Sequence, residues 1–413
     1  MNDKKNNSLL TILPPFKLSS LSRTFLKNIW QNLQKCRTKH WKQFVISDVK
    51  HAFVPERDMK SGSSISGQLR DTIFENKNSQ CRKIQIKIPI NSGEIYRTLT
   101  VFIVWYPDSV NVPPNIDAMM RQIVTWFCFI VPFVRPDCDC SHHTDVFLLL
   151  TSHDSVMPNS GEKLVVDDLF SAYTYTCRKN NEMFIMRQSV WLKALIHESF
   201  HTFGIDFSDA DFESAKTIIR KLFPGITQNV EIRLYESYTD IWATICYVLL
   251  NIGGGGRNKH TVKTKNRVVR SLRLRANTVP FKTIERELHR QCCFSVLQSA
   301  KMLRHTKTDM ESLLSRNGKY EESLMVFSYH VLRPIYMSDL NRFIEWTARH
   351  NDTRDYMRFR KENVDSFAQM IGVILERALW LSQYQKAGEI LSELHPTHQL
   401  SRTAVLTYPM EIV

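Results

Sequence analysis

The chain has 413 residues and a formal net charge of +14, with 43% hydrophobic and 11% aromatic residues. This length predicts about two to three domains with a sizeable core, and the composition excludes a disordered protein. The nine cysteines are odd in number and scattered, and the N-terminus has no charged-then-apolar signal segment. We therefore expect an intracellular protein in a reducing compartment.

Residues 1–65 are predicted to form a basic N-terminal extension, because Lys, Arg, Asn and Ser dominate it and acids are few. Its apolar residues recur at helical spacing, and these are Leu18, Leu21, Phe25, Ile29, Trp30 and Leu33. The pattern predicts an amphipathic helix that either packs on the rest of the protein or meets a membrane or partner. The Gly- and Ser-containing residues 59–68 are predicted to be a linker.

Residues 66–252 are predicted to be an α+β core. Alternating apolar and polar residues predict a hairpin of two strands, and short apolar runs predict two more strands. The four predicted strands cover residues 83–90, 98–106, 145–151 and 182–187.

The longest apolar run, residues 123–134, is shorter than the ~20 residues that span a bilayer. No transmembrane segment is therefore predicted. The run is expected to be a buried helix that begins near Asn115 or Asp117.

Cys138, Cys140, His142 and His143 form a dense patch of metal-binding residue types. Their spacing matches no zinc-finger pattern, and no second ligand pair follows. The patch is interpreted as a loop, with a second metal site as the alternative.

The motif His197-Glu198-Ser199-Phe200-His201 lies in an apolar stretch that predicts a buried helix. A spacing of four places His197 and His201 on one helix face, where two imidazoles can bind one metal ion. Zinc lowers the pKa of a bound water to ~7, and Glu198 is placed to accept the proton as general base. The motif therefore predicts hydrolysis at a zinc ion.

Two patterns can supply the third zinc ligand. A metzincin takes it from the position that Phe207 occupies here, and Asp206 and Asp209 flank that position out of register. A later segment offers Glu236, with Asp240 four residues further on, in apolar surroundings where a buried carboxylate needs a partner. We therefore expect Glu236 to be the third ligand.

Glu236 and Asp240, following the HExxH motif, resemble the ExxxD of the gluzincin metallopeptidases, the thermolysin-like class. The resemblance implies that Glu236 binds zinc together with the two histidines and that Asp240 orients a ligand histidine. It also implies that residues 172–187 line the cleft and pair with extended substrate by strand addition.

Three segments, residues 171–177, 183–208 and 235–240, are similar to uncharacterised metallopeptidase-like proteins of nucleocytoplasmic large DNA viruses. The similarity covers about residues 140–250. It implies a viral protein located in the host cytoplasm or the virion.

Residues 253–278 are predicted to be a basic Gly-rich loop. Within it, residues 257–275 hold eight Lys or Arg residues and no acid, which favours nonspecific contact with nucleic acid or another acidic surface. The segment has no interleaved aromatic residues for base stacking, so a flexible loop is the favoured interpretation.

Residues 279–413 are predicted to be a helical C-terminal lobe. Its predicted helices cover residues 281–305, 309–314, 321–332, 340–349 and 365–391. The gluzincin resemblance implies that this lobe supplies a hydrogen-bond donor to the oxyanion, for which Tyr329 and His330 are the candidates. Both residues could instead be ordinary core aromatics.

The sequence thus predicts an α+β zinc metallopeptidase, an endopeptidase acting on a protein or peptide substrate. Its expected architecture is a small mixed sheet packed on the HExxH helix, followed by a mainly helical C-terminal lobe. The alternative is a catalytically silent scaffold or virion protein of the same fold that binds nucleic acid or a partner through its basic surface.

Overall fold

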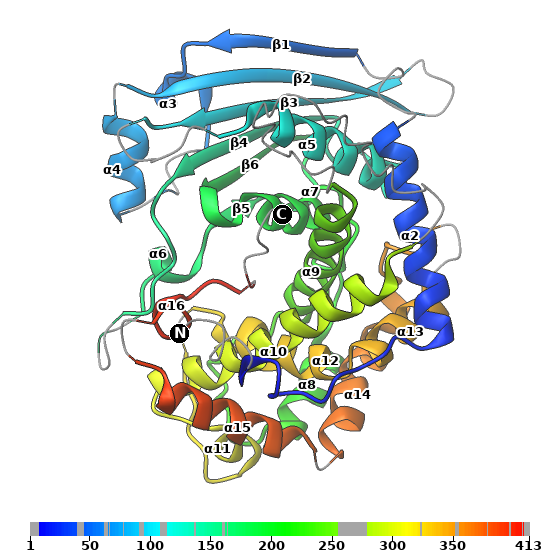
Figure 1. Ribbon diagram of the computed structural model, residues 1–413, viewed down its shortest axis with the longest axis vertical. Coiled ribbons are helices and arrows are strands. Elements are labelled where there is room, and N and C mark those ends of the chain that lie inside the picture. The colour runs from blue at the N-terminus through cyan, green and yellow to red at the C-terminus, as the bar shows by residue number, and fades with distance from the viewer. Residues whose placement is uncertain are drawn as a thin grey trace, which may run out of the picture.

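A six-stranded mixed sheet lies at one end of the computed structural model, and a mainly helical lobe forms the other end (Figure 1). The structure describes residues 8–38, 45–61, 65, 67–76, 78–90, 95–107, 114–135, 138–158, 162, 164–254, 279–322, 324–351, 355–377, 379–395, 398–406 and 408. The predicted α+β class with a helical C-terminal region is confirmed. The predicted basic loop at residues 257–275 lies outside the described residues.

The strand order in the sheet is β1-β2-β3-β4-β6-β5. The strands are β1 (Val45–His51), β2 (Gln80–Ile90), β3 (Ile95–Trp105), β4 (His143–Thr151), β5 (Ala172–Thr174) and β6 (Asn180–Arg187). β3, β4 and β6 are parallel, and the other neighbouring pairs are antiparallel. The four predicted strands are confirmed, whereas the edge strands β1 and β5 have no counterpart among them.

The two faces of the sheet are covered unequally. One face packs on the large core shared with the helices, and Ile84, Ile86 and Ile88 of β2 point into it because alternate residues share a face. The other face carries a smaller cluster covered by α4 (Gly67–Glu75). Met59 and Ile65 are buried in that cluster, so these two residues of the segment predicted as a linker pack against the sheet instead.

The predicted N-terminal helix is α2 (Ser20–Thr38), and it packs on α5 (Ile116–Ile130) with its apolar face buried. The packing interpretation of this helix is therefore confirmed. α5 begins after Asn115, whose side chain accepts a hydrogen bond from the N–H of Ala118. The segment Ile116–Phe133 is long and apolar enough to cross a membrane, but 61% of it is buried inside the molecule, as in a core helix.

The HExxH helix is α7 (Trp191–Thr202), which packs against β5 and β6 on one side and α9 on the other. α9 leads from the sheet layer into the helical lobe (Figure 1). The other helices beyond α7 are α8 (Glu213–Leu222), α9 (Leu234–Gly254), α10 (Phe281–His305), α11 (Met310–Leu314), α12 (Arg333–Ser338), α13 (Leu340–His350), α14 (Val364–Leu375), α15 (Leu379–Glu393) and α16 (Gln399–Arg402). α3 (Pro55–Asp58) and α6 (Val166–Leu169) are short helices that precede α7 in the chain.

Two predicted helices differ from the structure. The single helix expected at 365–391 is α14 followed by α15, because the chain turns at Glu376 and Arg377 so that α14 packs on α8 and α15 packs on α10. Periodicity along the sequence does not reveal such a change of packing partner.

The helix predicted at 321–332 is wrong at both ends. Met325 has a left-handed backbone with φ of 55°, and the Glu322 carboxylate accepts the N–H of Phe327 at 2.6 Å, so the helical segment begins later. The chain then passes through a π-helical turn, η5 (Ser328–Leu332), into α12.

Candidate metal centre

The end of α7 positions the side chains around His201. Gly204 has φ of +60° and donates its N–H to the His201 carbonyl, while Ile205 donates to the Phe200 carbonyl at 2.9 Å. This is the glycine-dependent helix end in which the chain turns back on itself. The turn brings Asp206 back to the His201 ring.

Three ligand-type atoms meet between α7 and α9. The Nε2 atoms of His197 and His201 are 3.1 Å apart, and the Glu236 Oε2 atom lies 3.1 Å from the first and 3.2 Å from the second. Tetrahedral bonds of ~2.0–2.1 Å to one ion separate their ligand atoms by roughly 3.3 Å. All three side chains are buried. This group could hold a metal ion.

A carboxylate lies behind each histidine. Asp240 Oδ1 is 3.3 Å from His197 Nδ1, and Asp206 Oδ2 contacts His201 Nδ1. A carboxylate at Nδ1 favours the tautomer that is protonated there and leaves the Nε2 lone pair free for an ion. Asp206, one of the alternative ligands, therefore supports a histidine instead, and Asp209 pairs with Lys361 near the surface.

Asp240 also pairs with two buried cations, Lys193 of α7 and Arg333 of α12. Burial opposes ionisation of Asp240, but the two cations outweigh it and hold the pKa of the carboxyl well below its ordinary range. Burial lowers the pKa of Lys193 to about 8. Neither cation was predicted as part of the site, although a lone arginine in the apolar segment 331–335 needs a carboxylate partner.

Glu198 interacts electrostatically with His197, His201 and Glu236 and, together with His197, lines a cavity of about 90 Å³. Burial raises the pKa of Glu198, and the nearby His197 and His201 rings oppose this shift only in part. A carboxylate of raised pKa next to a cavity with room for water has the properties of a general base.

The π-helical turn η5 directs both predicted oxyanion donors toward this region. The Tyr329 hydroxyl donates to Glu236 Oε2 at 2.6 Å, and its ring is 6.0 Å from the His197 ring. His330 lines the same cavity, and burial lowers its pKa to about 3, so the ring is neutral at pH 7. Its buried Nδ1 has no hydrogen-bond partner among the described residues. Isolated π-turns are frequent at functional sites.

Two further segments form walls of the cavity. Ser171 and Ala172 lie at the start of β5, so the expected cleft segment 172–187 reaches the cavity at its first residue. Residues 404–406 close another side, where the Ala404 N–H donates to the Ser155 carbonyl at 2.8 Å. The sequence alone contained no signal that the C-terminal segment returns to the site.

Comparison with known proteins adds no relative, since no family model, no curated protein and no solved structure matches this chain.

Proposed function

We propose that this protein is a zinc-dependent metallopeptidase of the gluzincin type, in which Glu198 is the general base. The observation that carries the proposal is the meeting of three ligand-type atoms within 3.1–3.2 Å, with a carboxylate behind each histidine. Two imidazoles and one carboxylate are a donor set that catalytic zinc sites use, with a fourth position left open. The motif resemblance to gluzincins supports the same assignment.

Bound to His197, His201 and Glu236, Zn²⁺ would supply a Lewis acid that acidifies water and polarises the scissile carbonyl. Glu198 takes a proton from the attacking water, whose oxygen bonds to the carbonyl carbon. Glu198 then gives that proton to the amine nitrogen as the C–N bond breaks. The hydroxyl of Tyr329 orients the Glu236 carboxylate, to which it donates at 2.6 Å.

In the proposed mechanism, the neutral His330 ring is the hydrogen-bond donor to the substrate oxygen. His330 lines the cavity and its buried Nδ1 has no partner among the described residues, so a donor on this ring can stabilise the negative charge that develops on the substrate oxygen. Because burial holds the pKa of His330 at about 3, the ring stays neutral across the pH range in which Glu198 acts as a base.

The proposed substrate is an extended peptide that pairs with β5. In the described sheet, β5 has a strand neighbour on one side only, and its first residue, Ala172, lines the cavity beside Glu198. A peptide added to that edge would run toward the reacting groups, with main-chain hydrogen bonds contributing affinity independently of sequence. Endopeptidase activity fits this binding mode, because the edge strand would form hydrogen bonds with the main chain of the peptide and would not require a free peptide terminus.

The test compares the Glu198→Gln protein with wild type in the digestion of a peptide library. We expect turnover to fall by ~10²–10⁴-fold, because the amide cannot accept the proton, while the bound metal stays at the wild-type level. Glu213→Gln, an amide substitution of an exposed carboxylate on α8, is the matched control and should leave turnover unchanged. Cleavage by Glu198→Gln at the wild-type rate would refute the mechanism.

A further inference from the structure

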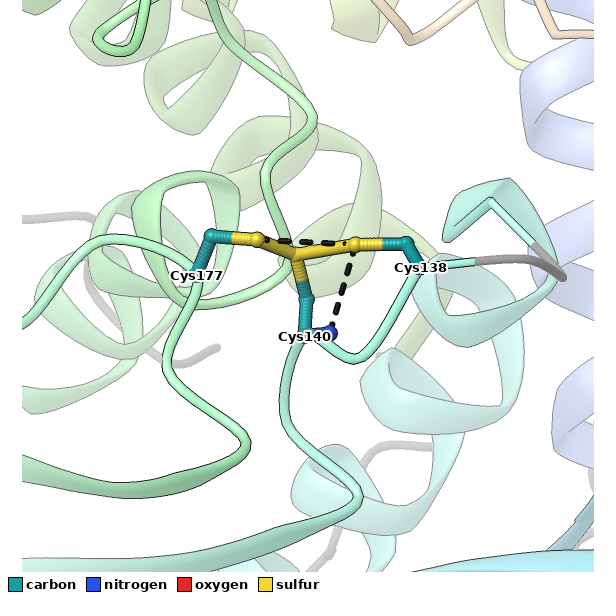
Figure 2. Close-up of side chains that lie close together, drawn as sticks. All are labelled: Cys138, Cys140 and Cys177. Carbon is teal, nitrogen blue, oxygen red and sulfur yellow. Dashed lines mark hydrogen bonds between the residues drawn. A yellow bond between two sulfur atoms is a disulfide. The ribbon is translucent and has the colours of Figure 1, made fainter.

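Three cysteines from two separate segments meet beside the end of α7. Cys138 and Cys140 lie in the loop before β4, and Cys177 lies in the turn between β5 and β6. Figure 2 shows Cys140 between the other two, whose Sγ atoms are 3.5 Å apart. Cys140 lies within disulfide reach of both neighbours.

This set differs from the patch that the sequence suggested. His142 and His143 pair with Asp139 and Asp145, at 3.5 and 3.0 Å, and do not join the sulfurs. The third member, Cys177, follows Cys140 by 37 residues. That separation explains why no zinc-finger spacing was visible.

The stoichiometry of the sulfurs favours an ion over a disulfide. One sulfur atom forms only one disulfide, so any disulfide of Cys140 leaves a third cysteine at the same point. Three thiolates that converge on one point are instead the ligand set that soft or borderline divalent cations prefer.

Charge and hydrogen bonding near the three cysteines favour the deprotonated, thiolate form of their side chains. The Arg97 side chain is only 2% exposed, and its guanidinium donates to the carbonyl oxygens of Cys140 and Cys138. A nearby guanidinium favours the thiolate over the thiol. Three thiolates and one divalent ion would carry a net charge of about −1, which the single charge of Arg97 balances. The Cys140 N–H also donates to Cys138 Sγ, at 3.2 Å.

The backbone is shaped to bring the cluster against α7. Ser141 and Cys177 have left-handed backbones with φ of 53° and 49°, which is uncommon for residues other than glycine. A Cβ added at Gly204 would meet Cys140 Sγ at 3.2 Å. The Cys177 N–H donates to the His201 carbonyl at 3.2 Å.

We propose that Cys138, Cys140 and Cys177 form a second, thiolate-only metal site that binds Zn²⁺ or a similar thiophilic divalent cation. Its ion joins the loop before β4 to the turn between β5 and β6. Because Cys177 caps the His201 carbonyl, the site holds the C-terminal end of α7 in place. It is a structural site, independent of whether the first centre cleaves peptides.

The experiment uses the His197→Ala protein, in which the first centre has lost a ligand. The protein is kept reduced, loaded with Zn²⁺, desalted and analysed for zinc per chain. We expect one equivalent to remain, and the further change Cys177→Ala to remove it. Cys81→Ala in the same background is the control, because Cys81 is a buried free cysteine in β2 that should not affect the zinc content.

A second measurement on the unaltered chain covers the case in which a cysteine variant does not fold. Alkylation followed by mass spectrometry should label Cys138, Cys140 and Cys177 only after a chelator has removed the ion. The proposal is overturned if reduced, loaded His197→Ala protein holds no zinc. It is equally overturned if Cys140 is found in a disulfide when thiols are trapped during cell lysis.

Discussion

Asp206 and Asp240 occupy equivalent positions behind the two histidines but lie in different electrostatic surroundings. Apart from His201, Asp206 receives hydrogen bonds from Ser208 and Thr239. Asp240 faces the buried cations Lys193 and Arg333 as well as its histidine. The same carboxylate-to-amide change should therefore have different consequences at the two positions.

Asp240→Asn should destabilise the fold by about 3–5 kcal/mol, because it leaves two buried cations without their anion. Asp206→Asn removes the anion from His201 alone, a ring that can give up its proton, so it should cost less stability and mainly weaken metal binding, by about 10–100-fold. Denaturant unfolding of the metal-free proteins, combined with metal titration, separates the two effects. Equal losses of stability in both variants would show that Asp240 does not stabilise the buried charges of Lys193 and Arg333.

Which site residues the sequence could predict depends on how local their pattern is. A spacing of four places His197 and His201 on one face of any helix, so their proximity was predictable from helix geometry. The choice of Glu236 rested on its apolar surroundings and on a family resemblance, since periodicity does not say which distant helix packs on α7. Arg333 was missed because its pairing with Asp240 depends on a long-range contact between α9 and α12.

At the scale of whole elements, an aromatic ladder holds four strands in register. Neighbouring rings stack with centroid separations of 4.9, 5.1 and 4.7 Å, and the ladder comprises Phe102, Phe147, Phe184 and Tyr173. These residues are direct partners across β3, β4, β6 and β5. A slip of one residue would turn the rings to the opposite face, so the ladder specifies the register.

Phe147→Ala should lower the free energy of unfolding by about 3–5 kcal/mol, because the ring is fully buried between two stacked neighbours. Val49→Ala is the control, since Val49 is 51% exposed on the edge strand β1 and should change stability by at most about 0.5 kcal/mol. Metal affinity should survive in Phe147→Ala, because the ladder belongs to the cluster on the face away from the main core. A stability loss equal to that of Val49→Ala would contradict this account.

Long, strongly patterned elements were predictable, and short or packing-defined ones were not. The helix predicted at 281–305 coincides with α10, whose apolar periodicity runs over the whole length of the helix. β5 has only three residues, too few for an alternation to be recognised. The left-handed backbone of Met325 left no sequence signal, because methionine has no preference for it.

At the scale of the whole molecule, the last described residues cross back to close the cavity. Lys301 of α10 donates from Nζ to the Thr403 carbonyl at 2.7 Å, and Gln298 donates to the Val405 carbonyl. Burial lowers the pKa of Lys301 to about 7. The C-terminal wall of the site is therefore tied to a lysine that titrates near neutral pH.

This lysine makes stability depend on pH. Between pH 7 and the unfolded-state pKa of about 10.4, the unfolded chain binds the proton that the folded chain has lost, so stability rises with pH by up to about 1.4 kcal/mol per unit. The gain in folding stability from the deprotonated Lys301 is complete above the unfolded-state pKa of about 10.4 and is lost as the pH falls to 7. Denaturant unfolding at pH 6.5 and 9 should show Lys301→Met gaining stability relative to wild type mainly at pH 6.5. An equal effect at both pH values would mean that Lys301 does not titrate in this range.

Diffraction at the zinc absorption edge can show whether one ion is held between α7 and α9. Crystals grown with Zn²⁺ should show an anomalous peak ~2.0–2.2 Å from His197 Nε2, His201 Nε2 and a Glu236 oxygen. Crystals of Glu236→Ala should lose most of that peak while the protein keeps its fold. An absent peak in wild type, or an unchanged peak in Glu236→Ala, would contradict the account.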